Sequence, residues 1–173
     1  PQRGVELKAH WSPPKWTRPK LTFDQAAAEL KRLLLAATAQ RLSVHGISGV
    51  SLSGGWDSPA VFGAAREVIR ASGVPAQVVP VSISYPEGDP GREDELSDQI
   101  ARHWDAQIHW LQSSDIPIID QPAVEARDRE LPWAHIYEHW NRVMPQALAK
   151  LDARVLLSGY GGDQLFQVSD IYL

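Results

Sequence analysis

The segment Val50–Pro59, which reads Val-Ser-Leu-Ser-Gly-Gly-Trp-Asp-Ser-Pro, constrains the fold of this chain more than any other stretch. A short apolar run ends at Leu52, and two consecutive glycines follow after one serine. Glycine adopts positive φ at little cost, so the two glycines let the backbone take that conformation and come close to a bulky anion. Ser58 is suited to cap a helix, and Pro59 to occupy its first position, where no N–H donor is needed. The pattern predicts a strand, a tight loop and a helix in succession.

The loop is a candidate site for a phosphate group. The free N–H groups and the dipole at the start of a helix favour an anion. Asp57 adds a carboxylate at the same place, which would repel phosphate unless a cation lies between them. Mg²⁺ prefers one or two carboxylates together with phosphate oxygens. The segment therefore predicts a magnesium–phosphate site, and the structural alternative is an ordinary capped turn between a strand and a helix.

The composition is that of an ordinary globular domain. The chain has 173 residues, of which 43% are hydrophobic and 22% charged, and its net charge of -4 argues against a nucleic-acid partner. It has no cysteine, which excludes disulfides, thiolate zinc sites and cysteine nucleophiles. We see neither a membrane span nor a secretory signal, so we expect a cytoplasmic protein without a membrane partner. The chain begins at Pro1 without an initiator Met and stops abruptly at Leu173, so we expect either a processed chain or part of a longer protein.

Periodicity predicts helices that alternate with strands. An extended lead-in is expected over 1–21 and a single domain over 22–173. The expected strands are Val44–Leu52, Gln77–Tyr85, Ala106–Leu111 and Arg154–Leu157. The first expected helix runs from a capping box at Thr22 to about Leu42, and the second covers Pro59–Ala71. A third begins at Asp89 and has Leu96, Ile100 and Trp104 on one side, and a fourth covers Trp133–Leu148 with a kink at Pro145. Gln112–Pro132 is expected to be a loop with a short helix around Val124–Arg129. This order predicts the α/β class, with a parallel sheet and helices on both faces.

A second glycine-rich loop, Ser158–Asp163, follows the last expected strand. Ligands of open parallel sheets bind outside the carboxyl ends of the strands. Because Ser53–Ser58 also follows a strand, we expect the two loops to lie in the same crevice.

The two loops together carry a resemblance to a known family. Ser53-Gly54-Gly55-Trp56-Asp57-Ser58 resembles the pyrophosphate loop of the ATP-pyrophosphatase superfamily. The run Ser158-Gly159-Tyr160-Gly161-Gly162-Asp163-Gln164-Leu165-Phe166 is similar to the Ser-Gly-x-Gly-x-Asp-Glu-Leu-Phe segment of the asparagine synthetase synthase domain. The resemblance extends from Thr22 to the end of the chain and fades in Gln112–Pro132. It implies a Rossmann-like adenine nucleotide α-hydrolase fold of the PP-loop type.

The resemblance also implies a reaction and its residues. Members of this family bind ATP with Mg²⁺, transfer AMP to a carboxylate and release pyrophosphate, and an amine then attacks the acyl-adenylate. Asp57 and Asp163 match the two magnesium-binding carboxylates, although Asp163 could instead cap a helix. Nucleotide contacts are implied for Leu52, Ser53, Gly54, Gly55, Asp57, Ser58, Ser82, Ile83, Gly159 and Gly161. Among them, Ser82 and Ile83 match the strand on which the family holds adenine by backbone contacts, and Leu52 is a similar case. A buried strand would explain Ile83 equally well.

Tyr160 departs from the asparagine synthetase pattern, which has Glu at this position. It resembles the tyrosine of β-lactam synthetases, which acts with a downstream Glu to deprotonate an amine of the substrate. A phenol has an ordinary pKa of about 10, so it needs a partner or a nearby cation to act as a base at neutral pH. The alternative is a tyrosine that only packs in a turn. Gln164 replaces the usual acidic residue, and Trp56 and Pro59 replace the usual small or aliphatic ones.

We therefore predict an ATP-dependent amide ligase that forms AMP and pyrophosphate and acts within one molecule or on a peptide, as β-lactam synthetases and lasso-peptide macrolactam cyclases do. Its substrate would be a small-molecule or peptide carboxylate. Three alternatives remain: part of a glutamine-dependent asparagine synthetase with a glutaminase domain or partner chain, an enzyme of the NAD synthetase, GMP synthetase or tRNA-modifying type, and a non-catalytic ATP-binding subunit. The Lys that stabilises pyrophosphate and the Glu partner of Tyr160 would lie beyond Leu173.

Some residues have simpler explanations. His135 and His139 are four apart on an expected helix and could ligate a metal, but a structural pair is the simpler reading because the helix supplies no third ligand. Glu95 lies in a charged first helical turn and could reach the nucleotide crevice. The seven tryptophans are expected to anchor the core and interfaces.

Overall fold

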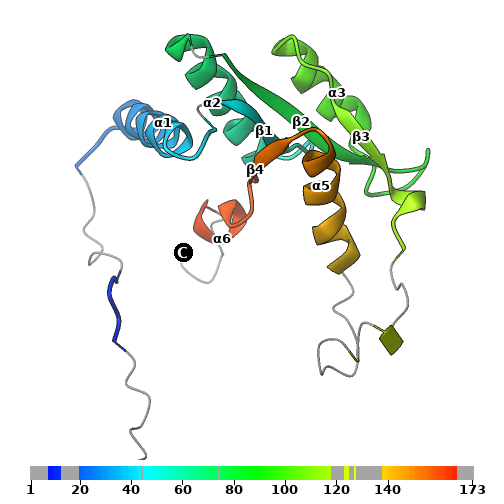
Figure 1. Ribbon diagram of the computed structural model, residues 1–173. Coiled ribbons are helices and arrows are strands. Elements are labelled where there is room, and N and C mark those ends of the chain that lie inside the picture. The colour runs from blue at the N-terminus through cyan, green and yellow to red at the C-terminus, as the bar shows by residue number, and fades with distance from the viewer. Residues whose placement is uncertain are drawn as a thin grey trace, which may run out of the picture.

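The computed structural model describes residues 8–12, 20–43, 45–73, 75–117, 123–124, 127 and 138–166. Their centre is a four-stranded sheet in the order β3-β2-β1-β4, in which every neighbouring pair is parallel (Figure 1). The strands are β1 (Gly46–Ser51), β2 (Ala76–Ser84), β3 (His109–Gln112) and β4 (Ala153–Leu157). The predicted α/β fold with a parallel sheet is confirmed.

Helices cover both faces of this sheet. The described helices are α1 (Phe23–Ala39), α2 (Asp57–Ser72), α3 (Asp94–His103), α5 (Glu138–Lys150) and the short α6 (Gly162–Phe166), with a 3₁₀ turn, η1 (Ser113–Asp115), after β3. Helices α2, α3 and α5 contact the strands, whereas α1 packs on α2. The chain moves across the sheet from β1 through β2 to β3 and then returns to β4. Right-handed crossovers therefore place α2 and α3 on one face and α5 on the other, above and below the sheet in Figure 1.

The core lies between the sheet and the helices α2 and α3. Its buried residues come from β1 and the residue after it, from β2, α2 and α3; they are Val50, Leu52, Phe62, Ala65, Val78 and Ala101. Trp104 packs against the edge of this cluster, and the guanidinium of Arg70 lies 5.8 Å from its ring centroid. This tryptophan matches the expected core role, whereas Trp56 is 92% exposed.

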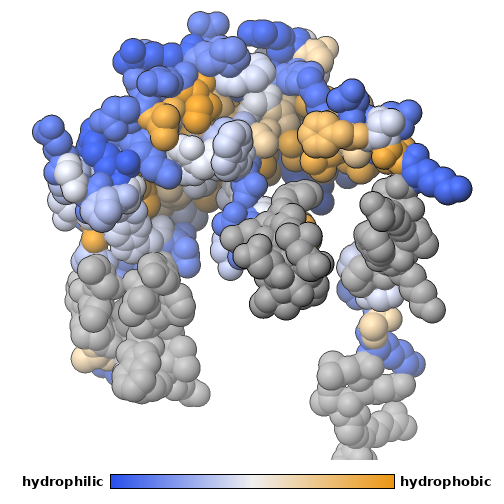
Figure 2. Space-filling view, turned by 180° about the vertical axis from the view of Figure 1, so that it is seen from behind, coloured by the Kyte–Doolittle hydropathy of each residue, from blue (hydrophilic) through white to orange (hydrophobic). Residues whose placement is uncertain are grey.

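Helix α1 begins as predicted and leaves apolar surface uncovered. The Thr22 hydroxyl accepts from the Gln25 N–H and the Gln25 side chain accepts from the Thr22 N–H, which is the capping box. The helix packs against α2 and ends at Ala39, three residues before the expected Leu42. Figure 2 shows apolar surface over this helix, to which Leu21, Phe23, Leu30 and Leu33 contribute.

Two helix starts differ from the prediction. Helix α2 begins at Asp57 with Trp56 at the N-cap, and its cap has no side-chain hydrogen bond, so Ser58 is not the cap. Helix α3 begins at Asp94 rather than at Asp89, because the Asp94 carboxylate accepts from the Ser84 hydroxyl and the Tyr85 N–H at the end of β2. The buried side of α3 therefore carries Asp94, Ser97 and Ala101, while Leu96 is 52% exposed.

Several predictions fall wholly or partly outside the described residues. Of the expected helix Trp133–Leu148, the structure describes α5 from Glu138, with Pro145 inside it. Of the short helix around Val124–Arg129, it describes only Val124 and Arg127, both helical. The lead-in over 1–21 is described at 8–12 and 20–21, so its division from the domain stays a prediction. No helix of the described part is both long and apolar enough to cross a membrane.

Candidate active site

The two glycine-rich loops meet at one edge of the sheet. Strand β1 pairs in parallel with β4, with Gly49 opposite Leu156 and Val50 opposite Leu157. The loops after these strands consequently leave the sheet side by side. The predicted shared crevice is confirmed.

Glycines of the second loop permit this close approach. A Cβ atom on Gly159 would lie 2.6 Å from the backbone nitrogen of Ser58 and 2.8 Å from the Cβ of Asp57, and one on Gly162 would overlap the Asp57 carboxylate. Gly161 has a φ of 95°, which glycine tolerates and other residues rarely adopt. The second loop thus needs glycine both for space and for backbone conformation.

Hydrogen bonds of two serines close the first loop on itself. The Ser53 N–H donates to the Ser58 hydroxyl over 2.8 Å, and the two hydroxyl oxygens are also 2.8 Å apart. The Gly55 N–H points to the Ser53 hydroxyl at 3.4 Å. Ser58 therefore shapes the loop instead of capping the helix.

Gly54 and Gly55 do not use the positive φ that glycine permits. Glycines with positive φ among the described residues are Gly46, Gly73, Gly88 and Gly161. A Cβ on Gly54 would lie 3.0 Å from the Cβ atoms of both Glu93 and Leu96. Gly54 is therefore required by the close approach of α3.

Glu93 is a site residue that the sequence analysis missed. Its carboxylate oxygen Oε2 accepts from the Gly54 N–H over 2.9 Å. The expectation that Glu95 reaches the crevice is wrong, because Glu95 pairs with Arg92 at 2.7 Å beside a separate cavity. That hydrogen bond lowers the pKa of the Glu95 carboxyl below its ordinary value. Glu93 reaches the first loop because β1 and β2 are neighbours in the sheet. Their pairing brings Glu93, the residue before α3, next to the loop after β1.

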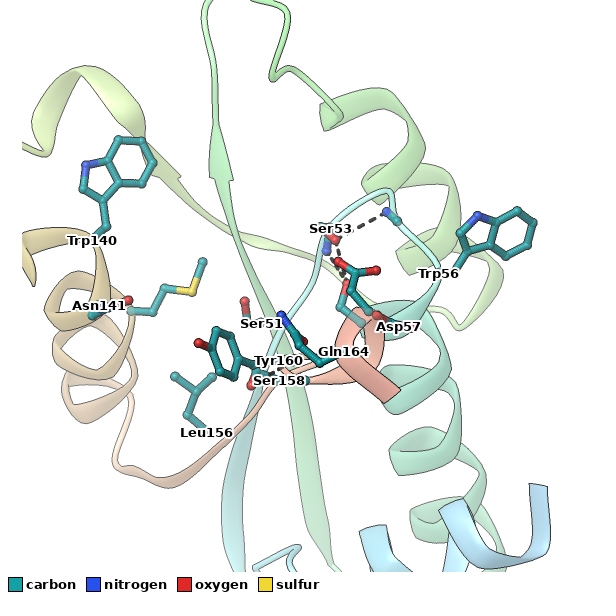
Figure 3. Close-up of a pocket in the computed structure, with 16 residues that line it drawn as sticks. Ser51, Ser53, Trp56, Asp57, Trp140, Asn141, Leu156, Ser158, Tyr160 and Gln164 are labelled. Carbon is teal, nitrogen blue, oxygen red and sulfur yellow. Dashed lines mark hydrogen bonds between the residues drawn. The ribbon is translucent and has the colours of Figure 1, made fainter. Parts of the chain in front are cut away.

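A cavity of about 690 Å³ lies between the two loops and α5 (Figure 3). Its polar side carries Ser53, Asp57 and Ser58 from the first loop and start of α2, and Asp163 from α6. Gly55, Gly159 and Gly161 also line it, whereas Gly54 faces Glu93 and does not.

Tyr160 lies in this cavity with its side chain 94% exposed. Its backbone N–H points to the Ser158 hydroxyl at 3.4 Å. A residue this exposed packs against little in the part of the chain that the structure describes, which speaks against the alternative of a packing tyrosine. The phenol is accessible to a bound ligand.

A second cavity of about 190 Å³ adjoins the first on the side of β2. Leu52, Ser82 and Ile83, the residues expected to contact adenine, all line it. The two cavities have Ser51, Ser53 and Met144 in common. The structure thus brings the expected adenine contacts next to the expected pyrophosphate loop.

Asp57 and Asp163 are suited to hold Mg²⁺. Both line the larger cavity, and two carboxylates beside phosphate oxygens are the ligand set this ion prefers. Asp163 lies inside α6 and not at its N-cap, so the capping alternative does not hold. The described residues contain no group of three or more His, Asp or Glu that could form a complete metal cage. His135 lies outside the described part, so the pairing of His135 with His139 stays untested.

The fold is of the α/β class, with two glycine-rich loops at the carboxyl ends of neighbouring parallel strands. The model of the asparagine synthase family matches residues 29–173, and the chain belongs to this family. Comparison with curated proteins gives no match. Membership supports an ATP-dependent amide ligase, with ATP as the nucleotide that the site is expected to accept.

Proposed function

We propose that this chain activates a substrate carboxylate with ATP and Mg²⁺ and that an amine of the same molecule or of a peptide then forms the amide. The observation that carries the proposal is the contact between the two loops, where Gly159 lies against the backbone of Asp57 and Ser58. That contact puts the carboxylates of Asp57 and Asp163 on one cavity with the hydroxyls of Ser53 and Ser58.

The proposed reaction has two steps. A carboxylate oxygen of the substrate attacks the α-phosphorus of ATP, the bond to the bridging oxygen breaks, and pyrophosphate leaves. The amine nitrogen then attacks the acyl carbon, AMP leaves, and the nitrogen loses a proton. A divalent ion at Asp57 and Asp163 would neutralise the charge on the phosphate oxygens in the first step. Ser53, Gly55 and Ser58 would surround the pyrophosphate from the first loop.

The remaining roles follow from the positions of the residues. Leu52, Ser82 and Ile83 would hold adenine in the smaller cavity, with Gly159 and Gly161 on the opposite side of the nucleotide. Tyr160 would take part in removing the proton from the amine. Its accessible phenol, at a position where asparagine synthetases have Glu, supports an amine supplied by the substrate over ammonia.

The test uses the full chain with Mg²⁺, ATP and peptides that carry both a free amine and a carboxylate. AMP and pyrophosphate are the expected products, and ADP with phosphate would refute the adenylation mechanism. Asp57→Asn should lower the rate at least about a hundredfold, since it removes charge stabilisation at the reacting phosphates.

Asp152→Asn is the matched control, because Asp152 lies in the turn before β4 at a φ of 57°, which Asn also tolerates. Its rate should equal that of the unaltered chain. Binding of ATP without turnover would favour a non-catalytic nucleotide-binding subunit instead.

A further inference from the structure

The larger cavity has a second wall, whose residues are not among those proposed to bind pyrophosphate. Trp140 and Met144, one helical turn apart on α5, form this wall together with Leu156 of β4. Asn141 is the polar residue beside them. In Figure 3, Trp140, Asn141 and Leu156 lie across the cavity from Ser53 and Asp57. We refer to Trp140, Met144 and Leu156 as the apolar wall.

An aromatic partner holds Trp140 in place. Its ring stacks on that of Tyr85, which follows β2, with centroids 5.9 Å apart and planes inclined by 27°. Burial raises the pKa of the Tyr85 phenol, and the carboxylates of Asp89 and Glu93 add to that effect. The phenol therefore stays neutral at physiological pH. A stacked indole loses little freedom when a ligand binds, so Trp140 is preorganised.

The position of the wall determines which part of a ligand it would contact. Met144 lines both the larger cavity and the smaller one, as do Ser51 and Ser53. A nucleoside in the smaller cavity would direct its 5′ end past these shared residues. A group attached to the α-phosphate would consequently lie against the apolar wall.

The charged side chains that the structure describes around the larger cavity offer no partner to a second anionic group on the substrate. Among its described lining residues, the charged ones are Asp57 and Asp163, and none is Lys, Arg or His. Another carboxylate on the substrate would thus find no cationic side chain among these residues, and a divalent ion held by the two aspartates would already be engaged by the phosphates. Burying an unpaired charge is costly.

We infer that the acyl substrate carries an apolar side chain and no further anionic group next to the carboxylate that is activated. The inference rests on the proposed function and names the substrate class of the same site. Free aspartate, with its second carboxylate, does not fit this wall.

The experiment measures binding of three stable probes to the full chain by calorimetry. The first is adenosine 5′-sulfamate without an acyl group, and the others are its N-phenylalanyl and N-aspartyl derivatives, which mimic acyl-adenylates. The phenylalanyl derivative should bind about tenfold or more tightly than the unacylated compound, because it buries an apolar side chain. The aspartyl derivative should bind no more tightly than the unacylated compound.

The variant Asn141→Lys tests whether the wall sets substrate preference, because it changes the charge beside the wall without changing the fold. Residue 141 is exposed on α5, so the substitution should leave the fold intact. A cation at this place should raise the affinity of the aspartyl derivative more than that of the phenylalanyl derivative, because the two share the acyl-sulfamate group and differ in the charge of the side chain. The matched control is Asn141→Gln, which lengthens the side chain without charge and should leave the preference as it is.

The outcomes separate the two proposals. Absence of binding by the unacylated compound would overturn the proposed nucleotide site and this inference with it. Binding of the unacylated compound, with the aspartyl derivative equal to or tighter than the phenylalanyl one, would overturn the inference alone.

Discussion

At Gly159 the second glycine-rich loop lies against the backbone of the first, at Asp57 and Ser58. Alanine there would place its Cβ 2.6 Å from the Ser58 nitrogen, and a backbone atom cannot move aside as a flexible side chain can. The closeness follows from the pairing of β1 with β4. The substitution would therefore push the loops apart.

We expect Gly159→Ala to weaken binding of ATP with Mg²⁺ about tenfold or more, since a displacement of the loops removes the shared contacts on the phosphates. It should also lower the melting temperature. Calorimetry and thermal denaturation measure the two effects. Gly55→Ala is the steric control, because its Cβ would meet only the Ser53 hydroxyl at 3.5 Å, and its melting temperature should not change.

The Glu93 carboxylate accepts a hydrogen bond from the Gly54 N–H of the first loop. The Gly54 N–H, 2.9 Å from Glu93 Oε2, would otherwise be available to a phosphate oxygen. The negative charge of Glu93 also opposes an anion beside it. The loop in this structure thus carries an internal competitor for phosphate.

Glu93→Ala should tighten the binding of pyrophosphate with Mg²⁺ several-fold, because the competing charge is gone. Glu87→Ala removes a carboxylate from the loop after β2 and is the control for net charge. Isothermal titration with inorganic pyrophosphate measures both. Weaker binding to Glu93→Ala would show that the carboxylate orders the loop and does not compete.

At the scale of elements, α5 packs against the sheet through Leu148 and Gly49. Leu148 is buried, and a Cβ on Gly49 would lie 2.9 Å from Leu148 Cγ and closer still to its Cδ atoms. The small residue in the middle of β1 thus lets α5 lie close to the strand. The apolar wall of the cavity belongs to the same helix.

Gly49→Ala should lower the free energy of unfolding by about 1–3 kcal/mol, as overpacking does. Leu148→Ala alone should cost about 2–5 kcal/mol through the cavity it leaves. Because the new methyl group partly fills that cavity, the double variant should lose less than the sum of the two. Denaturant titrations of the three variants test this, and simple additivity would contradict the contact.

At the scale of the whole molecule, the strand order assembles the site. Strand β1 lies between β2 and β4, so the loop after β1 receives Glu93 from one neighbour and the second glycine-rich loop from the other. Segments far apart in the sequence form one cavity. Ligand binding should therefore stabilise the fold as a unit.

We expect ATP with Mg²⁺ to raise the melting temperature by several degrees. A ligand at about 100 times its Kd adds about 2.7 kcal/mol to the free energy of unfolding. Adding a chelator of divalent ions should remove most of the shift, since the phosphates would then face Asp57 and Asp163 directly. Differential scanning calorimetry measures the change, and the same shift with ATP and chelator would contradict the magnesium role.

Local features predicted the elements well. The capping box at Thr22 starts α1, Gly73 ends α2 at a φ of 64°, and the β-branched run in β2 forms a buried strand. The glycine-rich loops at strand ends predicted the shared crevice. Each of these signals depends on residues next to one another in the chain.

The features of the site that the sequence did not predict depend on which segments become neighbours in the fold. The sequence alone determined an α/β fold with two glycine-rich loops, because hydrophobic period, caps and glycine preferences act over a few residues. Only the tertiary structure decided that Gly54 serves the close approach of α3, that Glu93 and not Glu95 reaches the loop, and that α5 lines the cavity with Trp140. A pair of glycines is compatible both with positive φ and with close packing. Which of the two the protein uses depends on the element that packs against the pair, and this is known only from the tertiary structure.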